Sequence, residues 1–336
     1  MTQRPKPVVA VVGAGAWGRN HVRNFHSLGV LAAVCDPSRD ALDQLRATTP
    51  GVQLTTEIES ILRDASVNSV VVATPAATHG SVARRCLEAG KHVFVEKPLC
   101  LDAEEALTLG ALADARGLVL MVGHLLLYHP AFNALGRMVK DGGLGQLRYV
   151  YSNRASLGKV RVEENALWSF APHDVSMILA LVGRLPARVL ATGANYITDG
   201  VADMTLSHLA FSKDLQAHIF VSWLHPYKDH RMVVIGSNGM IVFNDVAEGA
   251  DKLLLYRHVA TTNSGVPVVT RAKAEPIPYE ADEPLRLECQ HFLNCVETGA
   301  RPRSDAAEGY RVLRVLQACE QSIVLGRAVE VGSNGE

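Results

Sequence analysis

A glycine-rich turn between an apolar run and a segment of helical periodicity constrains this chain more than any other feature. The run Val8–Val12 is almost entirely valine, and the turn that follows, "GAGAWG", places glycines at Gly13, Gly15 and Gly18. Between a strand and a helix, this spacing allows a tight turn and lets a pyrophosphate approach the backbone closely. Backbone N–H groups at the start of the helix attract an anion. The sequence therefore predicts a dinucleotide-binding βαβ unit.

An acidic residue stands where such a unit binds the ribose of its dinucleotide. The second expected strand, Leu31–Cys35, ends at Asp36, about 20 residues beyond the glycines. A carboxylate there accepts hydrogen bonds from the ribose hydroxyls and repels a 2′-phosphate, so Asp36 favours NAD over NADP. Arg39 lies nearby and argues mildly in the other direction.

Strands and helices continue to alternate through the first half of the chain. The expected elements are Ser69–Thr74, Ser81–Ala89, His92–Glu96, Ala103–Ala115 and Leu118–Gly123. Such alternation is typical of a parallel sheet, whose ligands bind outside the carboxyl ends of the strands. Lys97, in "VEKPL", directly follows one of these strands, so we expect it at the ligand edge. The segments "ATPAATH" and "GHLLLYHP" are expected at the same edge.

From Leu147 the apolar residues recur with a period of two, which indicates half-buried strands joined by short turns. The expected strands are Leu147–Ser156, Val189–Tyr196, Met204–Phe211, Leu215–Trp223, Arg231–Ile235 and Met240–Phe243, and the expected closing helices are Pro284–Thr298 and Asp305–Leu325. Residues 256–283 are expected to form a long excursion of strand and loop. We predict an α/β protein with a Rossmann doubly wound parallel sheet in residues 1–125. A C-terminal α+β domain with a large, mostly antiparallel open sheet follows in residues 126–336, and its last helices are candidates for packing on the first domain.

The stretch "WSFAPHDVS" places a histidine and an aspartate side by side in an apolar run. Apolar residues after Pro172 follow helical spacing, and proline suits the first position of a helix. We therefore expect a helix that begins at Pro172, carries His173 and Asp174 in its first turn, and stops at Gly183. A buried histidine satisfied by a neighbouring backbone group is the alternative to a functional His173.

Basic residues gather just before this helix, at Arg154, Lys159 and Arg161. One interpretation is a solvated loop. The other is a clamp for an anionic substrate, because guanidinium groups bind carboxylate or phosphate through two parallel hydrogen bonds.

The overall composition narrows the class of protein. A formal net charge of −1 gives no electrostatic reason to expect nucleic acid or an anionic membrane as a partner. No apolar run approaches the roughly 20 residues of a spanning helix, and the amino terminus lacks a signal-peptide pattern, so we expect a cytoplasmic protein. The six cysteines show no spacing typical of zinc, so we expect buried, reduced thiols and no metal site.

With these residues identified, the chain resembles the Gfo/Idh/MocA (glucose–fructose oxidoreductase/inositol dehydrogenase) family over essentially its whole length. The motifs that carry the resemblance are "GAGAWG", "CDP", "ATPAATH", "EAGKHV" and "VEKPL", and His291–Ala318 reads like the last helices of the family. The resemblance implies a Rossmann domain and an α/β domain whose open sheet often mediates dimers or tetramers. We therefore expect a homo-oligomer, a homotetramer in the first instance.

The resemblance also implies roles for individual residues. His173 falls where the family places its catalytic histidine, so Lys97 and His173 form the expected catalytic pair. The expected cofactor-binding residues are Gly13, Gly15, Ala16, Trp17, Gly18, Asp36, Thr74, Pro75, His79, Glu96 and Lys97. Our candidates for substrate binding are His124, Tyr128, Arg154, Lys159, Arg161, Asn165, Trp168, His173 and Tyr227.

The chain departs from the common family pattern around His173. Many members carry an aspartate four residues before that histidine and another three after it, whereas this chain has Ser169 and Ser176 there. The segments 153–179 and 223–245 are similar instead to the bacterial UDP-N-acetylglucosaminuronate 3-dehydrogenases of lipopolysaccharide O-antigen biosynthesis. In that branch NAD oxidises the 3-hydroxyl of a UDP-linked uronic acid sugar, and some members recycle bound NADH with 2-oxoglutarate. A dehydrogenase of a free sugar or inositol, and a non-catalytic NAD-binding regulator, are the alternatives.

Oxidation of a secondary alcohol requires a base near the hydroxyl group. We predict that His173 is the base and that Lys97 orients the hydroxyl and stabilises the developing alkoxide. The reverse assignment stays open, because burial and the positive nicotinamide both lower the pKa of a lysine. Either assignment requires the two side chains to converge on one hydroxyl.

Overall fold

The computed structural model describes residues 5–158 and 160–332, which divide into two compact units. Unit 1 comprises the chain up to Tyr128 and the later segment Glu283–Leu313, and unit 2 comprises His129–Asp282 and the chain from Arg314 onward. The first boundary between the two units lies between residues 128 and 129, where the sequence predicted 125/126. The later segment Glu283–Leu313 belongs to unit 1 again.

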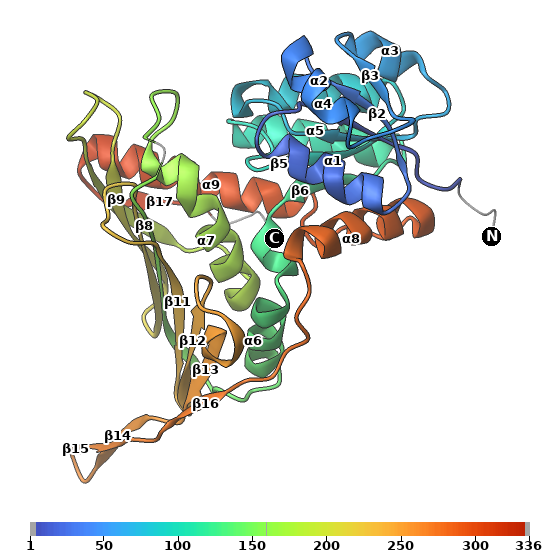
Figure 1. Cartoon of the computed structure of the whole chain (residues 1–336). Helices are drawn as coiled ribbons and strands as arrows, with labels where there is room; N and C mark the ends of the chain where they lie inside the picture. Colours follow the sequence, from blue (N-terminus) through green and yellow to red (C-terminus); the bar gives the residue numbers. More distant parts are fainter. Residues whose placement is uncertain (1–4, 159, 333–336) are drawn as a thin grey trace. The chain divides into compact units, whose positions relative to one another are not determined.

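Unit 1 is built on a parallel sheet of six strands in the order β3-β2-β1-β4-β5-β6 (Figure 1). The strands are β1 (Val9–Val12), β2 (Leu31–Cys35), β3 (Gln53–Thr55), β4 (Ser69–Val72), β5 (His92–Glu96) and β6 (Leu120–Gly123). Every residue of β1, β4 and β6 is buried, as expected for parallel strands covered on both faces. The order reverses between β1 and β4, so the ligand edge predicted from the sequence lies at the carboxyl ends of these strands.

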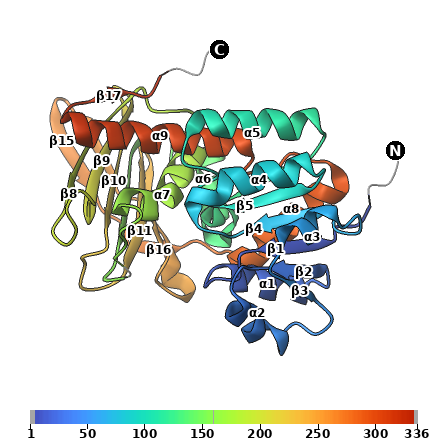
Figure 2. The same cartoon turned by 90° about the horizontal axis from the view of Figure 1, so that it is seen from above.

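Helices cover both faces of this sheet. The elements are α1 (Gly18–Ser27), α2 (Arg39–Arg46), α3 (Ile58–Arg63), η1 (Ala76–Thr78), α4 (His79–Glu88), α5 (Ala103–Ala115), η2 (Leu125–Tyr128) and α8 (Pro284–Thr298). Helix α1 packs with α8, whereas α4 packs with α5 and on β5 (Figure 2). Helix α9 (Ala306–Leu325) begins in unit 1 and ends in unit 2. The short elements α2, β3 and α3 were not predicted from the sequence.

Unit 2 is built on a sheet of nine strands in the order β16-β13-β12-β11-β7-β10-β9-β8-β17. The strands are β7 (Leu147–Ala155), β8 (Arg188–Ala194), β9 (Met204–Ser212), β10 (Leu215–Ser222), β11 (Asp229–Gly236), β12 (Gly239–Asn244), β13 (Leu253–Tyr256), β16 (Ala274–Pro276) and β17 (Val329–Glu330). Only β7 and β10 pair in parallel. The predicted fold class, a Rossmann sheet with a large and mostly antiparallel second sheet, is confirmed.

Helices of unit 2 cover one face of this sheet and leave the other face open (Figure 1). Helix α7 (Ala166–Val182) packs on β7, β9 and β10, and α6 (Pro130–Lys140) packs on α7 and β12. A short turn, η3 (Gly249–Lys252), precedes β13. The strands β14 (Val259–Asn263) and β15 (Val266–Thr270) form a separate hairpin within the excursion expected at residues 256–283.

Two further sequence expectations can be compared with the structure. All six cysteines are buried free thiols, as predicted. Within the described residues, no helix combines the length and the apolar character needed to span a bilayer.

Candidate active site

The glycine turn of unit 1 has the geometry that a pyrophosphate requires. A Cβ atom at Gly13 would lie 2.5 Å from the carbonyl oxygen of Ala73, and one at Gly18 would lie 2.0 Å from the carbonyl oxygen of Gly13. A Cβ at Gly15 would meet no atom within 4 Å, so the backbone there faces open space. Helix α1 starts without a side-chain cap and without an acidic residue in its first turn. These features fit the phosphates of a dinucleotide.

Asp36 stands at the carboxyl end of β2 and binds the glycine turn. Its Oδ2 atom accepts the backbone N–H of Ala14 at 2.6 Å, and its Oδ1 atom accepts that of Ser38 at 2.8 Å. Each carboxylate oxygen can accept more than one hydrogen bond, so capacity for ribose hydroxyls is left.

Glu96, the last residue of β5, binds Trp17 and His21, which precede it by more than seventy positions. Its Oε1 atom contacts the Nε2 atom of His21 at 2.5 Å and also accepts a hydrogen bond from the indole of Trp17. Burial raises the pKa of Glu96, but the hydrogen bonds from His21 and Trp17 outweigh burial and lower it overall. The predicted cofactor residues Trp17 and Glu96 therefore bind each other, and this contact joins the N-cap of α1 to the last residue of β5, which half-buried Lys97 follows in the chain.

His79, the last residue of "ATPAATH", contacts the backbone both of this motif, at Thr74, and of "VEKPL", at Pro98. It is 2% exposed, and its ring nitrogens lie 2.6 Å from the carbonyl oxygen of Pro98 and 2.8 Å from that of Thr74. The Thr74 side chain is half-buried and accepts a hydrogen bond from the Thr78 hydroxyl, and Pro75 is exposed.

His124 and Tyr128, two candidates for substrate binding, are buried in unit 1. The Nδ1 atom of His124 lies 2.5 Å from a carboxylate oxygen of Glu308, and the Tyr128 hydroxyl lies 2.8 Å from that of Ser304. Burial raises the pKa of Tyr128 strongly. The side chain of each is thus bound within unit 1, and sequence reasoning missed both partners because they lie on a distant segment.

In unit 2, helix α7 begins earlier than the sequence suggested. Its N-cap is Asn165, whose side chain accepts the backbone N–H of Trp168, and Pro172 lies inside the helix. The prediction that His173 occupies the first turn is therefore wrong. The stop at Gly183 is confirmed, with a φ of 79° and a hydrogen bond to the carbonyl oxygen of Leu179.

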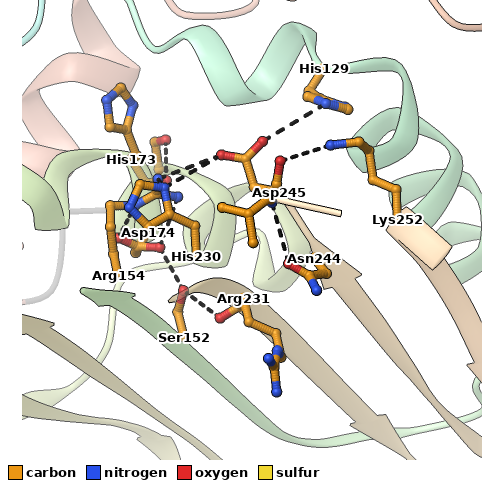
Figure 3. Close-up of polar contacts among 12 residues, drawn as sticks. His129, Ser152, Arg154, His173, Asp174, His230, Arg231, Asn244, Asp245 and Lys252 are labelled. Atoms are coloured by element: carbon orange, nitrogen blue, oxygen red, sulfur yellow. Dashed lines mark hydrogen bonds and ion pairs between the residues drawn. The ribbon is translucent and has the colours of Figure 1, made fainter. Parts of the chain in front are cut away.

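The adjacent residues His173 and Asp174 point in different directions from α7 (Figure 3). Asp174 is fully buried against the sheet, where it accepts hydrogen bonds from the Ser152 hydroxyl at 2.5 Å and the Nε atom of Arg154 at 2.9 Å. The ring of His173, which is half-buried, points away from these contacts. The Asp174 contacts therefore fix how α7 is rotated, and with it the direction of His173.

Arg154 belongs to a larger group of buried and half-buried polar side chains, the Arg154 cluster: Ser152, Arg154, Asp174, His230 and Asp245. The guanidinium donates to the Nδ1 atom of His230 at 3.1 Å and lies 3.8 Å from an oxygen of Asp245. Burial raises the pKa of Asp245, but His230 and Arg154 lower it to about 2. Arg154 thus faces two carboxylates of its own chain. His230 and Asp245 were missed from the sequence, because nothing in their spacing links them to Arg154.

The remaining substrate candidates differ in their exposure. Arg161 is an exposed ion-pair partner of Glu164 at 3.1 Å, and Lys159 lies outside the described residues. Asn165 and Trp168 both donate to Glu320, Trp168 through its indole at 3.0 Å. Tyr227 is 64% exposed and packs against the edge of His225. Lys97 belongs to unit 1 and His173 to unit 2, so their convergence stays a prediction.

Comparison with known proteins agrees with this arrangement. A family model described as an oxidoreductase family with an NAD-binding Rossmann fold matches residues 8–124, and the model of the GFO/IDH/MocA C-terminal domain matches residues 132–242. The chain therefore belongs to the Gfo/Idh/MocA family of oxidoreductases.

Individual relatives cover most of the chain. It is 29% identical to UDP-N-acetylglucosamine 3-dehydrogenase of Acidithiobacillus ferrooxidans over 90% of this chain and 93% of that protein. It is 26% identical to scyllo-inositol 2-dehydrogenase (NAD(+)) of Bacillus subtilis over 87% of each chain. A crystal structure of the Acidithiobacillus enzyme matches with a TM-score of 0.82 at 27% identity, over 94% of this chain and 96% of that one.

Proposed function

We propose that this chain is an NAD-dependent dehydrogenase that oxidises the 3-hydroxyl of UDP-N-acetylglucosaminuronate to the ketone. The observation that carries the proposal is the likeness to the Acidithiobacillus enzyme, whose name specifies oxidation at position 3 of a UDP-linked N-acetyl sugar. The likeness to the inositol dehydrogenase of Bacillus subtilis makes inositol the second candidate substrate. The product would be a 3-keto nucleotide sugar, a suitable substrate for an aminotransferase of surface-polysaccharide synthesis.

A uronate differs from its neutral sugar by a carboxylate, which requires a cationic partner. Arg154 is occupied by Asp174 and Asp245, so Arg161 is the better candidate among the described basic residues. The Arg161 side chain is 42% exposed and that of Glu164 is 19% exposed, so the pair is partly open to solvent, and ion pairs at a surface contribute about 1 kcal/mol or less. A substrate carboxylate could therefore replace Glu164 at little energetic cost.

Unit 1 supplies the residues that would hold NAD. Gly13, Gly15 and Gly18 would form the pyrophosphate turn, and Asp36 would accept the ribose hydroxyls and repel the 2′-phosphate of NADP. When bound, the nicotinamide accepts the hydride from the carbon that carries the hydroxyl group. Replacing Asp36 by serine should therefore raise the affinity for NADP relative to NAD, measured by fluorescence titration of the two reduced cofactors.

In this proposal His173 takes the proton of the 3-hydroxyl, and Lys97 orients that hydroxyl and stabilises the negative charge on its oxygen. Imidazole exchanges a proton readily near neutral pH, which suits it as the base. The fixed rotation of α7 supports this role, because a general base must be held within hydrogen-bond reach of its proton.

The experiment mixes purified protein and NAD with one of three substrates, UDP-N-acetylglucosaminuronate, UDP-N-acetylglucosamine or scyllo-inositol, and follows NADH absorbance. We expect the uronate to give the highest kcat/KM. Lys97→Ala and His173→Ala should each lose about 10²-fold or more in kcat and still bind NADH. The exposed-residue control Lys140→Ala should keep wild-type activity. Turnover only with inositol, or wild-type turnover in either variant, would contradict the proposal. A single turnover that becomes continuous on adding 2-oxoglutarate would identify the route of NADH recycling.

The open face of the unit 2 sheet supports a homo-oligomer. Leu190 and Leu206 are each 44% exposed on neighbouring strands of this sheet, and Tyr151 stacks on His218 with ring centroids 5.3 Å apart. Exposed apolar and aromatic side chains on one face are typical of protein interfaces. Leu206→Glu should lower the mass measured by analytical ultracentrifugation, whereas Val324→Glu on α9 is the control. An unchanged mass in Leu206→Glu would argue against this interface.

A further inference from the structure

The ring of His79 bridges two loops at the ligand edge of unit 1. One ring nitrogen lies 2.6 Å from the carbonyl oxygen of Pro98, which directly follows Lys97. The other lies 2.8 Å from the carbonyl oxygen of Thr74, at the end of the neighbouring strand β4. Because His79 is 2% exposed, bulk water cannot replace either partner.

Both partners of this ring are carbonyl oxygens, which only accept hydrogen bonds, so the ring must supply the N–H donors. A neutral imidazole has one N–H and can donate to only one carbonyl, whereas a ring that carries both protons donates to both. In either state the ring nitrogens are used by the backbone, so they have no donor left for a ligand. His79 therefore acts on the ligand edge through the two loops that it joins.

These two loops carry Thr74, Pro75 and Lys97 of the predicted cofactor site. The Thr74 loop packs against the glycine turn so closely that a Cβ at Gly13 would lie 2.9 Å from the backbone nitrogen of Thr74. The other loop contains Lys97, whose backbone N–H donates to Glu96 at 3.1 Å. One buried ring thus connects the turn for the phosphates with the loop that presents Lys97.

We propose that His79 is a positioning residue that sets the place of Lys97 relative to the Thr74 loop and the glycine turn. The catalytic part of this proposal rests on the proposed function, which makes Lys97 part of the reaction. The structural part concerns cofactor binding and the environment of the Lys97 amine, and it does not depend on which substrate this chain oxidises.

The chain offers a matched control at the other edge of the same sheet. Lys91 is 5% exposed, and its Nζ atom donates to the carbonyl oxygens of Asp64 and Val67, each at 2.6 Å. Lys91 therefore also joins two backbone carbonyls through a buried side chain, but it does so before β5 begins. Lys91→Met removes a bridge of the same kind without touching the ligand edge.

The test compares His79→Phe and His79→Gln with Lys91→Met. Phenylalanine keeps a ring, somewhat larger than imidazole, without a donor, and glutamine keeps a single donor nitrogen, its amide NH2. Three quantities are measured: the thermal unfolding midpoint, the Kd for NADH by fluorescence, and the rate at which an amine reagent labels Lys97, by mass spectrometry. None of them needs a sugar substrate, so a failure of the proposed function does not affect them.

We expect His79→Phe to weaken NADH binding by about tenfold, or about 1.4 kcal/mol, and to speed labelling of Lys97. His79→Gln should fall between Phe and wild type, and Lys91→Met should lower only the unfolding midpoint. With an active substrate, kcat of His79→Phe should fall by about 10²-fold, the cost of a displaced catalytic group. Wild-type NADH affinity and Lys97 labelling in His79→Phe would overturn the proposal. An equal loss in Lys91→Met would overturn it as well, because the effect would then be one of stability. If His79→Phe does not fold, wild-type values in His79→Gln would be the overturning result.

Discussion

Replacing Arg154 by methionine should destabilise unit 2 more than replacing Asp174 by asparagine. The Arg154 side chain is 6% exposed, binds Asp174 at 2.9 Å and lies 3.8 Å from Asp245. Without it, two carboxylates lose their guanidinium, and removing one partner of a buried ion pair costs about 3–5 kcal/mol. Without the charge of Asp174, Arg154 still faces Asp245, so only hydrogen bonds to a charged group weaken, at about 1–3 kcal/mol.

The double variant R154M/D174L removes both partners of the ion pair and leaves neither charge unpaired by the other. Apolar residues of similar volume often replace a buried ion pair without loss of stability. We therefore expect the double variant to be more stable than R154M, by about 2 kcal/mol, although Asp245 still lacks its guanidinium. With the single variant D174L measured as well, the non-additivity of R154M and D174L is the signature of a direct contact.

The assay is urea unfolding followed by tryptophan fluorescence in a Trp17→Phe background. The two remaining tryptophans, Trp168 and Trp223, both lie in unit 2, so the signal reports that unit. Arg148→Met is the control, because Arg148 is an exposed arginine on the same strand. The reasoning is refuted if R154M costs less than about 1 kcal/mol, the scale of a surface ion pair, or less than D174N.

Three further predictions concern protons and glycines. Burial lowers the pKa of His230, although the nearby Asp245 carboxylate opposes this, so the unfolded chain binds the extra proton first. The melting temperature should therefore fall from about pH 7 to about pH 5, and less steeply in His230→Asn. Burial and the nearby charge of Glu96 raise the pKa of Glu288 well above its ordinary value. The folded state therefore binds a proton that the unfolded chain releases, and Glu288 destabilises the fold more as the pH rises. Glu288→Met should raise the melting temperature, and more at about pH 8 than at about pH 5. Gly18→Ala should prevent folding of unit 1, whereas Gly15→Ala should keep the circular dichroism spectrum and weaken NADH binding, because of the three glycines in the turn Gly15 alone has room for a Cβ, with no protein atom within 4 Å.

Local patterns were sufficient for most of the elements. Helices Ala103–Ala115 and Pro284–Thr298 match their predicted bounds, since one begins after a capping aspartate and the other at a first-turn proline. The strand Leu31–Cys35 also matches, because its apolar run ends at Asp36. The missed helices α2 and α3 are short. Helix α6 was also missed, although it has 11 residues and begins at a proline.

The start of α7 shows how two local signals can compete. Pro172 and Asn165 are both common at helix starts, and apolar spacing continues on either side of Pro172. The structure begins the helix at Asn165, where capping satisfies the N–H of Trp168, and accepts a proline inside the helix. Tertiary contacts favour the longer helix: Trp168 reaches Glu320 on α9, a contact that no local pattern predicts.

The burial of Arg154 could have been inferred from the sequence, although its partner could not. In the strand Leu147–Ala155, side chains alternate between faces, so Val150, Ser152 and Arg154 share one face. Val150 places that face against the core, and a buried guanidinium requires a carboxylate within the chain. The same alternation that predicted the strand therefore also predicts that Arg154 has a carboxylate partner within its own chain. Its partner, Asp174, depends on the rotation of α7 over the sheet, and that rotation also directs His173 away from the cluster.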